Sequence, residues 1–315
     1  VDGFIAKFNN DGTLAKVDAI AGSGTDLAEN IELDQNNNVY ISGSFDGSLN
    51  FTPTLSTDDL TATMNNTAVF FAKYNSTGSF LWSKKIESPV LVTLTDMDIA
   101  SSQVYLSGYY RDTTDFNPNG GIFNLSPAGN NDGFFARYNT NGSLIWAKSI
   151  KGIDNEAIEN IHVNLDGNIL ITGHYFNSID LDPSSGNTSF ISSLGQRDLF
   201  FAQYNSSGSL RWGKSIGSAD DDYGYAITTD NQRRIFVSGT FQDVMNVDPN
   251  TGKAVNIDNT GGGIDVFFAR YDSTGNFEWA QTAGGNNGEL IADIEVNNVL
   301  EMYTVGWFQG GIGLF

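Results

Sequence analysis

Two glycines recur along the chain at nearly constant spacing, and this repetition restricts the fold more than any other feature. The first glycine follows a short turn, as in "FFARYNTNGSLIWAKSI" (134–150). It falls at Gly12, Gly78, Gly142, Gly208 and Gly275. The second closes segments such as "YISG" and "LITG", at Gly43, Gly108, Gly173, Gly239 and Gly306. A proline follows ten residues later at Pro53, Pro118, Pro183 and Pro249, so three landmarks share one period of 64 to 67 residues.

Each repeat divides into four short strands, which we call A, B, C and D in chain order. In the third copy, A and B are "AIENIHVN" and "NILITGHYF", joined by "LDG". C and D are "DLFFAQYN" and "SLRWGKSI", joined by "SSG". Gly, Asn and Asp tolerate the positive φ that tight hairpins require. Four-stranded antiparallel sheets in tandem predict an all-β chain folded as a β-propeller, whereas a solenoid usually has shorter, parallel repeats.

The two ends of the chain predict how the ring closes. Residues 2–20 read as strands C and D alone, and residues 288–308 read as A and B alone. Joined, they would complete a fifth sheet. We therefore expect residues 1–315 to form a single domain, a five-bladed propeller of about 65-residue repeats closed by its own termini. The chain starts at Val1 without an initiator Met, which favours a mature product or a piece of a longer protein that could add further blades.

Charge and composition exclude several classes of protein. Thirty-seven acidic and sixteen basic residues leave a net charge of −21, which should repel nucleic acid. The carboxylates suit divalent cations, or they serve only solubility. The absence of cysteine excludes disulfides and thiolate metal sites. No stretch approaches the roughly 20 apolar residues of a membrane span.

One acidic position recurs before strand A and is a candidate metal site. Seventeen residues before each second glycine stand Asp26, Leu91, Glu156, Asp222 and Glu289. In a propeller the A strands line the central channel, so the four acidic residues would form a ring of carboxylates that could hold Ca²⁺. The alternative is that these side chains are solvated turn residues or accept hydrogen bonds from nearby backbone N–H groups.

A variable position after the second glycine is the candidate recognition surface. It holds Ser44, Tyr109, His174, Thr240 and Trp307, and the next residue is always aromatic and expected in the core. Tyr109, His174 and Trp307 are the predicted ligand-binding residues, because such side chains stack on sugars or on partner side chains. The long B-to-C insertions contain segments such as "DLDPSSG", which we interpret as turns because the spacing is not that of a calcium loop.

The repeats resemble the SBBP-type β-propeller repeat of bacterial secreted and surface proteins, frequent in Bacteroidetes. The segments that carry the resemblance are "DGFFARYNTNGSLIWAKSIKG", "DGNILITGHY" and "DLDPSSGNTSFISSLG". The first copy departs from the pattern, since "NFTPTLSTDD" lacks both aspartates and Lys16 replaces the tryptophan. The resemblance covers essentially the whole chain. It implies a propeller at the cell surface or outside the cell, and no particular ligand.

These observations favour a non-catalytic extracellular binding or adhesion module that recognises a glycan or a surface protein. The alternative is a structural scaffold or spacer within a larger surface protein. A glycosidase is a third class, since some propellers place carboxylates at the channel mouth. Catalysis needs one repeat to diverge from the others, and these repeats stay alike, with His162 and His174 as the only histidines. We therefore predict no enzymatic activity and no certain cofactor.

Overall fold

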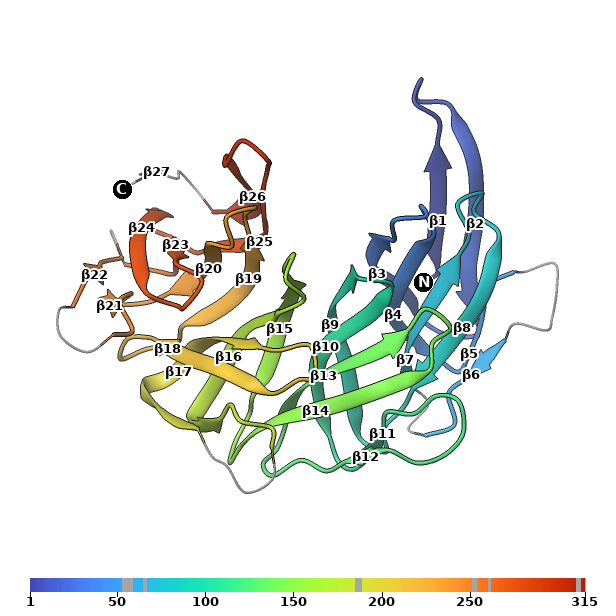
Figure 1. The fold of residues 1–315 in the computed structure, drawn as a ribbon, viewed down its shortest axis with the longest axis horizontal. Coiled ribbons are helices and arrows are strands. Elements are labelled where there is room, and N and C mark those ends of the chain that lie inside the picture. The colour runs from blue at the N-terminus through green and yellow to red at the C-terminus, as the bar shows by residue number, and fades with distance from the viewer. Residues whose placement is uncertain are drawn as a thin grey trace. The chain divides into compact units, whose positions relative to one another are not determined.

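The computed structural model describes residues 1–52, 59–64, 67–184, 189–250, 254–259, 262–309 and 313–314. Pro53, one of the four repeated prolines, lies outside them. Within these ranges every regular element is a β-strand, and no helix is present (Figure 1). The chain groups into two compact units: unit 1 comprises Val1–Pro127 and Phe134–Lys148, and unit 2 comprises Ala128–Gly133 and Ser149–Phe315. The all-β prediction is confirmed.

Four-stranded antiparallel sheets follow one another along the chain, as the repeat predicts. Unit 1 contains the sheet β3(Asp26–Leu33), β4(Val39–Asp46), β7(Thr67–Tyr74) and β8(Phe80–Ile86). Unit 2 contains β15(Ala157–Val163), β16(Ile169–Asp180), β17(Phe190–Tyr204) and β18(Leu210–Ile216). It also contains β19(Tyr223–Thr229), β20(Ile235–Phe241), β23(Asp265–Tyr271) and β24(Phe277–Gly284). Between these come β9(Leu91–Ala100), β10(Gln103–Arg111), β13(Asp132–Asn139) and β14(Leu144–Gly152), of which β13 and β14 straddle the unit boundary. The end of β14 pairs with β16 through Lys151 and Asp180, so these four strands and β15–β18 join in one eight-stranded sheet.

The terminal strands form incomplete sheets. At the start, β1(Gly3–Phe8) pairs with β2(Leu14–Gly22), which continues to β5(Ser48–Asn50) and β6(Leu60–Thr61). At the end, β25(Glu289–Val296) and β26(Met302–Phe308) make a two-stranded sheet of the described residues. The predicted fifth sheet and the closed ring are therefore not confirmed.

The insertions between strands B and C add short strands. They are β11(Thr114–Asp115) with β12(Asn124–Leu125), and β21(Met245–Asn246) with β22(Asn256–Ile257). The last strand, β27(Gly313–Leu314), pairs with the end of β24. The end of β2 pairs with β5 in the same manner, so the close of a D strand repeatedly meets the start of the next insertion. The sequence pattern does not reveal this pairing.

The C strands form the centre of the hydrophobic core because they are apolar on both faces. Phe71 of β7 packs on Tyr138 of β13, with ring centroids 4.8 Å apart. In unit 2, Phe201 of β17 packs on Tyr271 of β23 at 4.6 Å. All four side chains are buried. Within each unit, neighbouring sheets therefore pack against one another through these rings, and their burial stabilises the unit.

The two repeated glycines have distinct structural causes. The turn glycines, among them Gly142 with φ 72°, adopt the left-handed conformation that a side chain disfavours. The second glycines lie opposite a β-bulge in strand A, where a Cβ would collide with a backbone carbonyl: Gly173 faces the Ala157 carbonyl, and Gly239 faces that of Tyr223. Replacement by any other residue would push strands A and B apart.

Two of the D-strand tryptophans, Trp82 and Trp212, pack against the turn of the next repeat. Trp82 lies against Gly142 of the next hairpin and donates from its indole N–H to the Thr140 carbonyl at 3.1 Å. Trp212 lies against Gly275 in the same way. Lys84 and Lys214, two residues after these tryptophans, also lie over the next turn, so their aliphatic chains add to the packing between repeats.

A buried tyrosine holds the insertion in the second, third and fourth copies. The hydroxyl of Tyr138 donates to the Phe116 carbonyl at 2.9 Å, and Tyr204 and Tyr271 do the same for Leu181 and Val247. The first aspartate of the "DLDP" segment, Asp180, accepts N–H groups from the turn and from the returning strand. These carboxylates stabilise turns, which agrees with the interpretation from the sequence.

Candidate functional site

The variable position on strand B faces the bulge of strand A. The bulged residues are Glu29, Thr95, Glu159, Tyr225 and Ala292. Three of them lie beside the variable residue of their own repeat: Glu29 beside Ser44, Glu159 beside His174, and Tyr225 beside Thr240. Bulges redirect side chains next to binding sites. The sequence indicates the variable position on strand B but not the bulged residue of strand A beside it, because a bulge does not alter the pattern of apolar residues.

His174 belongs to a cluster of aromatic and charged side chains in unit 2, which we call the His174 cluster: His174, Glu159, Arg197, Asp221, Tyr223 and Tyr225. The Nδ1 atom of His174 lies 3.3 Å from Oε1 of Glu159. Its ring meets Tyr223 edge-on, with centroids 4.8 Å apart. Tyr223 stacks on Tyr225 at 5.7 Å, with the rings 9° from parallel. All six residues are partly exposed.

Charged groups complete the His174 cluster. The guanidinium of Arg197 lies 6.0 Å from the centre of the Tyr223 ring and 3.3 Å from Oδ1 of Asp221. Burial, followed by the Glu159 carboxylate, raises the pKa of Tyr225 to about 12. The hydroxyl of Tyr225 is therefore protonated at neutral pH. The cluster presents aromatic rings, two carboxylates and one guanidinium, a set suited to polar ligands with apolar faces.

The other two predicted ligand-binding residues have different surroundings. Trp307, 56% exposed, lines a groove of about 420 Å³ in unit 2 with Met302, Val305 and Phe308. Tyr109 lies on β10 in unit 1 and is half-buried. Within unit 2, then, His174 belongs to a polar cluster and Trp307 to an apolar groove.

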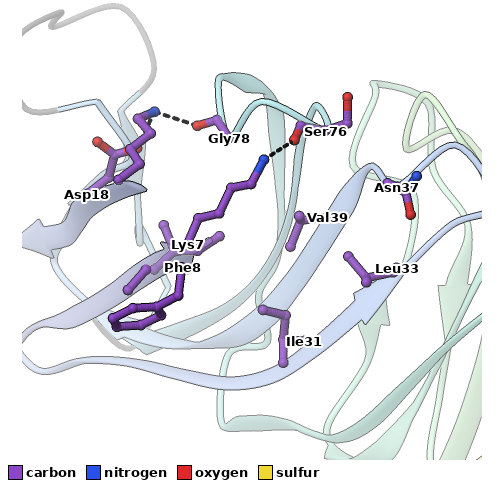
Figure 2. Close-up of a pocket in the computed structure, with 12 residues that line it drawn as sticks. Lys7, Phe8, Asp18, Ile31, Leu33, Asn37, Val39, Ser76 and Gly78 are labelled. Atoms are coloured by element: carbon purple, nitrogen blue, oxygen red, sulfur yellow. Dashed lines mark hydrogen bonds and ion pairs between the residues drawn. The ribbon is translucent and has the colours of Figure 1, made fainter. Parts of the chain in front are cut away.

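A second groove, of about 530 Å³, lies in unit 1 between the first hairpin and the following sheet (Figure 2). Ile31, Leu33 and Val39 form its apolar wall. Lys7 reaches across it to donate to the Ser76 carbonyl at 2.7 Å, as Figure 2 shows. Phe8 at its edge is 61% exposed. The groove contains none of the predicted site residues.

The predicted carboxylate ring consists of buried residues, not solvated ones. Asp26, Glu156 and Asp222 are fully buried and Glu289 is 2% exposed. Asp222 accepts the backbone N–H groups of Ser218 and Gln242, as the backbone-bonding interpretation expects. Burial raises the pKa of Asp222 to about 7, although the hydrogen bonds that its carboxylate accepts oppose this shift. Leu91, the exception in the series, is partly buried on β9.

Neither carboxylate oxygen of Asp26, Glu156 or Glu289 has a hydrogen-bond partner. Burial, followed by the charge of Asp132, raises the pKa of Glu156 to about 8. In the described part of the chain, no three acidic or histidine side chains gather at a common point, so the predicted calcium site is not confirmed. Those same ranges contain no helix of the length and apolarity needed to cross a membrane.

Comparison with known proteins supports a β-propeller repeat protein. Residues 120–144 match the family described as "Domain of unknown function (DUF5122) beta-propeller". The chain is also similar to an uncharacterised WD repeat-containing protein of Acanthamoeba polyphaga mimivirus, at 26% identity over 363 aligned residues. That alignment covers 97% of this chain and 26% of the relative, so the chain spans about a quarter of the relative's length. Neither match supports the SBBP type in particular.

Proposed function

We propose that this chain is a non-catalytic binding module that recognises a glycan, with the His174 cluster as its recognition surface. The observation that carries the proposal is the partly exposed arrangement of Tyr223, Tyr225 and His174 beside Arg197 and Glu159. Aromatic rings cover the apolar faces of sugars, and the charged groups bond their hydroxyls. The pairs Glu29–Ser44 and Tyr225–Thr240 occupy the same two positions in other repeats, so the side chains offered to a ligand would differ from repeat to repeat.

A glycan array tests this proposal. The whole chain is applied once with calcium and once with a chelator. We expect binding to a restricted set of sugars, and Tyr223→Ala should weaken it at least roughly tenfold, as the loss of a central aromatic contact does. Tyr303→Ala is the matched control, because Tyr303 is an exposed tyrosine on β26, outside the cluster. An array without signal in both conditions, or equal weakening by both variants, would reject the proposal.

The location proposed for the module is the bacterial cell surface or the medium. The SBBP-type motifs support it, and so does the net charge of −21, which disfavours nucleic acid as the partner. The test is protease accessibility on intact cells that produce the parent protein. Protection of the chain until the cells are lysed would contradict an extracellular location.

We also infer that the ring is closed, with β1, β2, β25 and β26 as its fifth sheet. Phe4 of β1 is 69% exposed, although its counterparts Phe70 and Phe200 are fully buried. Phe308 of β26 is 53% exposed, although its counterpart Phe241 is buried. Pairing β1 with β26 would cover Phe4 and Phe308. The resulting stabilisation would grow with the apolar area removed from water.

A scaffold is the second candidate function. The relative is nearly four times as long as the matched segment, which favours a role as one part of a larger chain. A scaffold would ignore free sugars on the array and would co-purify with a protein partner. A module that binds sugars would lose its captured partner on addition of the free sugar.

A further inference from the structure

Two acidic positions recur together in the repeats. One lies ten residues before the turn glycine, at the start of strand C, and the other lies at the start of the next strand A. The pairs are Asp2 with Asp26, Asp132 with Glu156, Asp198 with Asp222, and Asp265 with Glu289. The remaining copy has Ala68 and Leu91 at these positions, so both carboxyl groups are absent together. Joint loss indicates that the two groups act as a unit.

The pair Asp132 and Glu156, both in unit 2, shows the geometry. Both side chains are fully buried. The Asp132 carboxylate accepts the Ala128 N–H at 3.0 Å and lies 3.4 Å from the Ser149 hydroxyl. The Glu156 carboxylate lies directly against Gly152, in space that a Cβ would occupy. The N–H groups of Gly152 and Asp154 point toward Glu156 but do not reach hydrogen-bond geometry, and both of its oxygens are without a partner.

The charges with the largest effect on Glu156 are negative. They come from Asp132 and then from Asp154. Glu156 is a close neighbour of Asp132, since its N–H donates to the Asn131 carbonyl at 2.9 Å. Two buried carboxylates that act on one another are costly unless a proton or a cation neutralises them. The interaction of Asp132 with Glu156 is electrostatic, with no hydrogen bond between the carboxyl groups. One shared proton would require such a hydrogen bond, whereas a cation would balance both charges without it.

Asp265 and Glu289 repeat this arrangement in the same unit. Asp265 lies against Gly284, the Glu289 oxygens are without partners, and the charge of Asp265 acts on Glu289. Asp222 in the pair between them is different, because backbone N–H groups satisfy both of its oxygens. In two of the three pairs of unit 2, therefore, both oxygens of the second carboxyl group are without a partner, whereas in the pair between them only Asp198 Oδ1 is.

We propose that the pair Asp132–Glu156, and likewise Asp265–Glu289, each binds one calcium ion. Oxygen-only ligands with two carboxylates select a hard cation, and backbone carbonyls with water would complete the shell. These two sites differ from the single carboxylate ring that the sequence predicts, because each ion would be bound by its own pair of carboxylates. It does not depend on glycan recognition.

Calorimetric titration of the chelator-stripped whole chain with calcium chloride, together with thermal melts, tests the proposal. We expect saturable heat and a higher melting temperature with calcium. Glu156→Gln should remove one equivalent of bound calcium and reduce the melting shift. Glu295→Gln is the control, because it makes the same chemical change at an exposed glutamate of β25 and should keep the full stoichiometry.

A second variant covers the case in which Glu156→Gln does not fold. The double change Asp132→Ala with Glu156→Leu copies the natural Ala68 and Leu91 pair, so we expect it to fold and to bind one calcium fewer. Absence of heat and of a melting shift in the unaltered chain would overturn the proposal. So would full stoichiometry in either variant. Stabilisation by acid without any response to calcium would also overturn it, since that outcome indicates a shared proton.

Discussion

A single tyrosine in each repeat shows how one hydroxyl can fix a long insertion. Tyr138 is fully buried and donates to the Phe116 carbonyl, whereas the hydroxyl of Tyr74, its counterpart in the first copy, is buried without a partner. The first copy also departs from the "DxDP" pattern, reading "NFTP" there. Both tyrosines are buried beside a phenylalanine, Tyr138 beside Phe71 and Tyr74 beside Phe80, and only Tyr138 makes this hydrogen bond.

Replacing Tyr138 or Tyr74 by phenylalanine should have different effects on the free energy of unfolding. Tyr138→Phe should lower the free energy of unfolding by about 1–2 kcal/mol, because it leaves the Phe116 carbonyl unpaired. Tyr74→Phe should change it by less than about 0.5 kcal/mol or raise it, since no bond is lost. Urea unfolding of both variants measures the difference. Equal losses would show that the hydroxyl of Tyr138 does not stabilise the insertion.

Asp272 is the one acidic residue at a hairpin position that holds asparagine in the other four copies. Partial burial alone would raise its pKa, but hydrogen bonds from Asn276 and Thr274 outweigh burial and lower it to about 2. A carboxyl group with a lowered pKa stabilises the fold above its unfolded pKa of about 4, and the contribution disappears as the pH falls toward 2.

Asp272→Asn should therefore leave the turn intact and remove the pH-dependent contribution of this residue to the stability of the fold. Asn139 accepts the same two turn N–H groups in its own hairpin, which shows that the amide fits. We expect equal melting temperatures at pH 7 and a steeper fall for the unaltered chain between about pH 4 and pH 2. Melts across that range measure the difference, and parallel curves would refute the assignment.

At the scale of elements, a strand D tryptophan holds the turn of the next hairpin within each unit, Trp82 in unit 1 and Trp212 in unit 2. Trp212 lies against Gly275 of the next turn and meets Phe201 edge-on at 5.8 Å. In the first copy Lys16 takes this place and donates to the Gly78 carbonyl. An aromatic contact in one repeat is thus replaced by a partly exposed polar contact in another.

Trp212→Ala should destabilise unit 2 by about 3 kcal/mol, since it leaves a cavity between two sheets. Lys16→Ala should cost less than about 1 kcal/mol, because exposed charged contacts contribute little. Denaturant unfolding of the two variants gives the comparison. If Trp212→Ala costs no more than Lys16→Ala, the tryptophan is not an inter-repeat packing residue.

At the scale of the whole molecule, the described sheets predict the register that β1 and β26 would have in the proposed fifth sheet. Strand B pairs with strand C through Ile41 and Ala72 in one sheet, and through Val237 and Ala269 in another. By the same register Thr304 of β26 should lie opposite Ala6 of β1. Residues directly opposite have Cβ atoms about 5 Å apart, within reach of a disulfide after slight adjustment.

Because the chain has no cysteine, the register can be tested by a designed disulfide. Ala6→Cys with Thr304→Cys should oxidise to an intramolecular bond and raise the melting temperature. Ala6→Cys with Val305→Cys is the control, since a shift of one residue places the side chains on opposite faces. Gel mobility with and without reductant measures both. Disulfide-linked dimers would show closure through a second copy, and equal reaction of both pairs would contradict the register.

The sequence by itself determined the all-β fold, the four-stranded sheets and the positions of the turns. These features follow from local rules: alternation of apolar residues, and glycine where the backbone requires positive φ. It also pointed to His174, because a variable position stood beside an invariant aromatic one.

Only the tertiary structure decided which side chains meet and which lose water. The bulge that brings Glu159 to His174, the ring of Tyr223 beside it, and the burial of Glu156 against Gly152 depend on strands and sheets far apart in sequence. The local sequence around a carboxylate on a predicted turn is the same whether the folded structure exposes that carboxylate or buries it. Its desolvation comes from the neighbouring sheet, and no local pattern encodes that contact.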